Sequence, residues 1–164
     1  SPGVVLISRP MRRNFKDLSA PEVLALAISL EEEDARIFRE FARLVRPNYP
    51  KAAASLDAMC AQEDAHRRRL IEMFRKKYGE EIPLVRRQDV RGFVRRDPVQ
   101  SLRAPSVDHI RRRVALMELE AARYYDKAAE QATFIISSGG LAARARRCRR
   151  LARRDWAATL AAFR

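Results

Sequence analysis

The stretch MCAQEDAH, residues 59–66, contains the most informative pair of side chains in the chain, Glu63 and His66. A spacing of three residues is close to one helical turn, so in a helix both side chains leave the same face. The apolar residues of the surrounding segment share that face: Leu56, Met59, Leu70 and Met73. Because burying a charge is costly unless it is paired or bound to a metal, this stripe predicts either a metal site or a hydrogen-bonded structural pair.

Two helices are predicted in the first half of the chain. Ser19, with Glu22 three residues later and Pro21 in the first turn, has the pattern of a capping box that opens a helix over residues 20–45. Glu31 falls within the apolar rhythm of that helix, whereas the three acids that follow it, Glu32, Glu33 and Asp34, spread around its other faces and are expected to be solvated. The second helix should span residues 51–78 and end at Gly79.

The helical rhythm stops in residues 80–105, which contain Pro83, Pro98 and Pro105. A structureless loop of this length is uncommon in a compact domain. We therefore predict a crossover along the length of a bundle, with a short helical turn near residues 89–95. A third helix should follow over about residues 106–135, with Glu118 against its apolar stripe. After a turn at residues 137–140, an Arg- and Ala-rich fourth helix should span residues 141–163.

Two helices, one long crossover and two more helices predict an all-α protein, a ferritin-like four-helix bundle with a single long connection. We expect the domain to occupy residues 19–164. Residues 1–18 would be a poorly ordered N-terminal extension.

The composition agrees with one helical domain of 164 residues. Two cysteines do not make a disulfide framework, which favours a reducing, cytoplasmic compartment. No apolar run approaches the roughly 18 residues of a membrane span. The formal charge is +13, and residues 139–164 carry eight arginines against one acid. This basic tail supports an alternative function, a non-catalytic helical module that binds nucleic acid or an anionic membrane.

The chain resembles rubrerythrin-type ferritin-like proteins and, more narrowly, the ferritin-like domain of bacterial membrane-bound ferritins, the erythrin–vacuolar iron transporter family. Four segments carry the resemblance: AISLEEED at 27–34, EDAHRRRLI at 63–71, IPLVRRQDVRGF at 82–93 and MELEAARYY at 117–125. The crossover segment is the most family-specific of them. The resemblance covers about residues 11–133. Proteins of that family usually continue into a membrane transporter, and this chain ends before such a region.

The resemblance implies a di-iron carboxylate site, a role in iron homeostasis, Fe(II) oxidation and a homodimer. The implied metal ligands are Glu31, Glu63, His66 and Glu118, with Glu32, Glu120 and Asp155 as further candidates. The ligand types suit iron, manganese or zinc. No catalytic residue is assigned.

The sequence departs from that pattern in the fourth helix, where a second Glu-x-x-His is expected. Around this position Asp155 could replace a glutamate, but Ala158 cannot replace a histidine. We therefore expect one tight metal position and one weak or empty one. A frameshifted or degenerate tail is our hypothesis for the difference.

Overall fold

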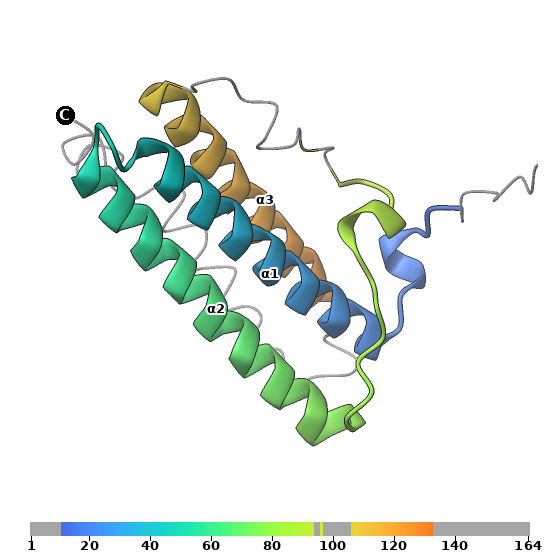
Figure 1. The fold of residues 1–164 in the computed structure, drawn as a ribbon. Coiled ribbons are helices and arrows are strands. Elements are labelled where there is room, and N and C mark those ends of the chain that lie inside the picture. The colour runs from blue at the N-terminus through green and yellow to red at the C-terminus, as the bar shows by residue number, and fades with distance from the viewer. Residues whose placement is uncertain (1–10, 94–95, 97–105, 133–164) are drawn as a thin grey trace, which may run out of the picture.

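The computed structural model describes residues 11–93, 96 and 106–132, and within these ranges its regular structure is helical. Three long helices make up the described bundle: α1 (Ala20–Val45), α2 (Pro50–Tyr78) and α3 (Val107–Ala132). Figure 1 shows α1 and α2 as an antiparallel pair, with α3 running along the same axis. α2 ends at one end of the bundle and α3 begins at the other, so the connection spans the bundle as the sequence predicted.

Helix α1 begins with the predicted capping box. The Ser19 hydroxyl accepts a hydrogen bond from the Glu22 amide, and the Glu22 carboxylate accepts one from the Ser19 amide. Arg13 also donates to this carboxylate, and its hydrogen bond lowers the pKa of Glu22 to about 2. The cap therefore fixes the start of α1 and ties it to the segment that precedes it.

Helix α2 ends at Gly79, also as predicted. Gly79 has a φ of 94°, in the left-handed region that glycine enters without steric cost, and its amide bonds the carbonyl of Arg75. The buried stripe of α2 contains Leu56, Glu63, His66 and Leu70. Cys60 and Phe74 are also buried in this stripe. Met59 and Met73, which the sequence placed on it, are only partly buried.

The N-terminal segment pairs with the described part of the crossover through backbone hydrogen bonds. Arg13 and Val90 form an isolated parallel bridge, in which the Arg13 amide bonds the carbonyl of Asp89 at 2.9 Å. The short helical turn is the 3-10 helix η2 at Arg87–Asp89, so its expected position near residues 89–95 was wrong by about one turn. Backbone pairing with residue 13, which local periodicity does not reveal, fixes this position.

Residues 11–18, assigned from the sequence to an extension, pack against the helices. They include the 3-10 helix η1 (Phe15–Asp17), and Leu18 is buried in the core. The Gln131 side-chain amide donates to the Leu18 carbonyl at 2.9 Å, which joins this segment to α3. Residues 1–10 and the predicted fourth helix at 141–163, with the basic tail, lie outside the described residues. The domain limits stay a prediction.

Two hydrophobic clusters make up the core and lie towards opposite ends of α1. One contains Leu24, Leu26 and Tyr125; the other contains Phe38, Phe41 and Ile110. Glu31 lies between them in the sequence of α1. No helix in the described part of the chain is long and apolar enough to cross a membrane.

Candidate metal centre

Three of the predicted ligands meet between α1 and α2. Glu31, Glu63 and His66 each offer a ligand atom, and these atoms all lie within 4.8 Å of one another. Nδ1 of His66 is 3.6 Å from Oε2 of Glu31 and 3.5 Å from Oε2 of Glu63. The three-residue spacing that singled out Glu63 and His66 thus places both opposite a carboxylate of the neighbouring helix.

All three side chains are buried, with exposed fractions of 3% for Glu31, 7% for Glu63 and 5% for His66. Two carboxylates and an imidazole so far from water need compensation from protons, hydrogen bonds or a cation. The contacts from His66 to the two carboxylates, at 3.5 and 3.6 Å, are long for hydrogen bonds and provide only part of that compensation. The same contacts also agree with the structural pair that the sequence left open.

A tyrosine from α3 contacts the group of Glu31, Glu63 and His66. The Tyr125 hydroxyl donates a hydrogen bond to Oε1 of Glu31. Tyr125 packs edge-on against Tyr124, with ring centroids 5.2 Å apart. Burial raises the pKa of Tyr124, and the negative charge of Glu31 raises it further. The Tyr124 phenol is therefore a donor at neutral pH, and the hydrogen bond from Tyr125 orients the Glu31 carboxylate.

The other predicted ligands lie elsewhere or outside the described residues. Glu118 is buried on α3, with 5% of its surface exposed, but it is not a member of the three-residue group found among the described residues. Glu32 is exposed and lies 3.7 Å from Arg67. Glu120 accepts hydrogen bonds from Arg87 and Arg96. Asp155 lies outside the described residues.

Sequence reasoning missed a charged cluster next to the site. It placed Asp34 among the solvated acids, but Asp34 is 7% exposed and its carboxylate is 2.6 Å from Arg96. Burial raises the pKa of Asp34 to about 6, although Arg96 opposes the shift. The pKa of Arg96 is raised, because Asp34 and Glu120 outweigh its own burial.

Arg87 and Arg96 link the crossover to two helices. Arg87 donates to Glu33 of α1 at 2.9 Å and to Glu120 of α3 at 3.0 Å, and Arg96 donates to Asp34 and Glu120. The arginines were visible in the sequence, but their partners lie 24 to 62 residues away. Helical periodicity carries no signal for such distant pairs.

The donor set of the three-residue group fits a borderline divalent cation. Carboxylate oxygen with imidazole nitrogen suits Fe(II), Mn(II) and Zn(II), whereas a site for calcium or magnesium would be built from oxygen alone. Three protein ligands also leave coordination positions for solvent or substrate. The chemistry of the residues therefore fits the metal that the resemblance implied.

The bundle of long helices and the buried carboxylate–histidine group agree with a ferritin-like protein. The sequence model of the rubrerythrin family matches residues 22–135, and the chain belongs to that family. This match includes the four residues Glu31, Glu63, His66 and Glu118 and ends before the predicted fourth helix. No curated protein and no solved structure matches the chain.

Proposed function

We propose that this chain is an iron-binding ferritin-like domain that acts in iron homeostasis. The observation that carries the proposal is the buried group of Glu31, Glu63 and His66 in a chain of the rubrerythrin family. The relationship to the ferritin-like domain of membrane-bound ferritins is part of the same proposal and rests on the segments quoted above.

In this proposal Glu31, Glu63 and His66 hold one tight metal position. Glu118 contributes to a second, weaker position, because it is the remaining buried glutamate among the described residues of α3. Iron bound there would supply one-electron redox chemistry. Tyr125 holds Glu31 in one orientation, and the burial of all three ligands limits the access of water.

We include Fe(II) oxidation as the activity. Fe(II) is then the substrate and loses one electron to become Fe(III), and dioxygen is the electron acceptor. The two carboxylates favour Fe(III) over Fe(II), because anionic ligands stabilise the higher charge. A site with one strong position predicts slow oxidation, since the reduction of dioxygen to hydrogen peroxide takes up two protons and two electrons, and the electrons must come from two Fe(II) ions.

A homodimer is also proposed, from the resemblance. Leu116 and Leu119 on α3 have exposed fractions of 55% and 39% and offer apolar surface for it. Sedimentation equilibrium on the full chain tests this directly, and a mass that stays monomeric at high concentration would contradict it.

Calorimetric titration with Fe(II) under anaerobic conditions tests the metal proposal. Wild type should bind Fe(II), and Glu63→Gln should weaken binding by at least about tenfold because it removes one anionic ligand. Asp64→Asn is the matched control: it removes the adjacent carboxylate, which lies 3.5 Å from Arg39 rather than in the group. Equal loss in both variants would contradict a specific site.

A further inference from the structure

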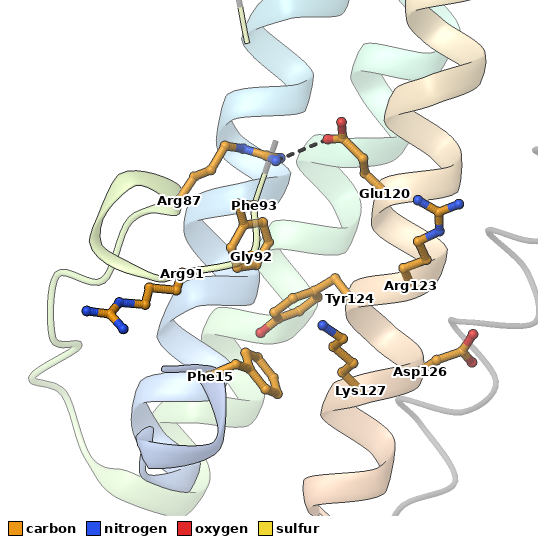
Figure 2. Close-up of a pocket in the computed structure, with 10 residues that line it drawn as sticks. All are labelled: Phe15, Arg87, Arg91, Gly92, Phe93, Glu120, Arg123, Tyr124, Asp126 and Lys127. Atoms are coloured by element: carbon orange, nitrogen blue, oxygen red, sulfur yellow. Dashed lines mark hydrogen bonds and ion pairs between the residues drawn. The ribbon is translucent and has the colours of Figure 1, made fainter. Parts of the chain in front are cut away.

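A cavity of about 320 Å³ lies beside Tyr124 and is lined in part by Arg87 and Glu120 of the charged cluster. It lies between η1, the crossover and α3 (Figure 2). Small-molecule sites usually have volumes of about 300–1,000 Å³, with mostly apolar walls and a few well-placed polar groups. The cavity is at the lower end of that range.

Aromatic rings form its apolar wall. Phe15 and Phe93 both pack against Tyr124, with ring centroids 5.8 Å and 6.1 Å away. Tyr124 is fixed because its hydroxyl donates to the carbonyl of Val23. The Arg87 guanidinium lies 5.3 Å from the centre of the Phe93 ring and holds that ring against the crossover. The wall is therefore built by rings from three separate segments that the fold brings together.

Basic groups predominate among the charged side chains of the cavity. Four basic residues line it, namely Arg87, Arg91, Arg123 and Lys127, against the two acids Glu120 and Asp126. Arg87 and Glu120 pair with each other, which leaves Arg91, Arg123 and Lys127 against Asp126. Figure 2 shows the Lys127 side chain extending from α3 towards the Tyr124 ring. The local charge is therefore complementary to an anion that lies over the rings.

We propose that this cavity binds a small organic anion that carries a planar ring, with the ring against Phe15, Phe93 and Tyr124 and the acidic group beside Lys127. The aromatic wall selects the ring by stacking and edge contacts, and the cations select the charge. The proposed iron site does not require this second ligand, so a negative result for one proposal does not contradict the other.

Two probes with the same ring separate these contributions. Naphthalene-2-sulfonate carries the ring and a negative charge, and naphthalene-2-methanol carries the ring without the charge. Calorimetry on the full chain at low ionic strength should show that the sulfonate binds at least about fivefold more tightly, and that added salt reduces the difference. Equal affinities, or no binding of the sulfonate at millimolar concentration, would overturn the proposal.

A double variant locates the site. Lys127→Gln with Arg123→Gln removes two positive charges from the lining and should weaken binding of the sulfonate by at least about twofold, since the exposed charge pair with Lys127 contributes roughly two- to fivefold. Arg112→Gln is the matched control, because Arg112 is exposed on the same helix and is not among the residues that line the cavity. Thermal unfolding verifies that both variants fold. Unchanged affinity in the double variant would contradict the proposed site, and so would an equal loss in the control.

Discussion

The Tyr125 hydroxyl on α3 donates a hydrogen bond to Oε1 of Glu31 on α1. This bond connects α3 to the group that Glu31, Glu63 and His66 form between α1 and α2. It gives α3 a role in the proposed site even though Glu118 is outside the three-residue group.

Removing that hydroxyl should affect both stability and metal affinity. Tyr125→Phe should lower the free energy of unfolding by about 1–3 kcal/mol, the range for hydrogen bonds to charged groups. It should also weaken Fe(II) binding by about tenfold, because Glu31 loses its orienting partner. Urea unfolding and anaerobic titration measure the two effects. Tyr124→Phe is the control: it loses a bond to the Val23 carbonyl and should keep full metal affinity.

The ion pair between Arg96 and Asp34 should contribute strongly to stability. Arg96→Met leaves the buried Asp34 carboxylate without its closest cation and should cost about 3 kcal/mol at pH 7, where this group is mainly ionised. The exposed Arg112→Met should change the free energy of unfolding by less than about 0.5 kcal/mol.

The same variant predicts a pH dependence. The pKa of Asp34 in the folded state is raised to about 6 from 3.8, so its ionisation destabilises the folded state as the pH rises between these values. Without Arg96 the pKa of Asp34 rises further. The deficit of Arg96→Met in urea unfolding should therefore be smaller at pH 5 than at pH 7. A deficit that grows towards pH 5 would contradict this account.

The cap of α1 predicts the opposite dependence on pH. Hydrogen bonding to Arg13 lowers the pKa of Glu22 to about 2 from 4.5, so its ionised form stabilises the folded state above pH 4.5. That contribution is lost as the pH falls towards 2. Glu22→Gln should lower the free energy of unfolding by up to about 1 kcal/mol at pH 6, the size of a surface cap and ion pair. At pH 2 the variant and wild type should be equally stable.

Glu118 is predicted to affect only the weaker metal position. Glu118→Gln should leave the first equivalent of Fe(II) bound and reduce the binding of any further metal. Glu72→Gln, at an exposed position of α2, is the control. If Glu118→Gln removed the first equivalent, Glu118 would belong to the tight position.

Local patterns in the sequence predicted the three long helices of the described residues and singled out Glu31, Glu63 and His66, which the structure brings together. The capping box at Ser19, the stop at Gly79 and the pair Glu63 and His66 are all set by residues within one or two turns. Glu31 was found because it interrupts an apolar stripe. Such features need no knowledge of the tertiary structure.

What the sequence did not predict depends on the path of the crossover. Asp34 looked solvated because its partner Arg96 is 62 residues away and reaches it only after the chain has returned along the bundle. The aromatic cavity likewise combines Phe15, Phe93 and Tyr124 from three segments. The periodicity of a single helix carries no information about contacts between distant segments of the chain.

The most direct test of the proposed function is the metal content per chain after anaerobic loading with Fe(II), compared between wild type, His66→Ala and His109→Ala. His109 is the other histidine in the sequence and lies outside the three-residue group. The account predicts at least one iron per chain in wild type and in His109→Ala, and loss of the tightly bound iron in His66→Ala. Iron retained in His66→Ala, or absent from wild type, would contradict it and would favour Glu63 and His66 as a structural pair.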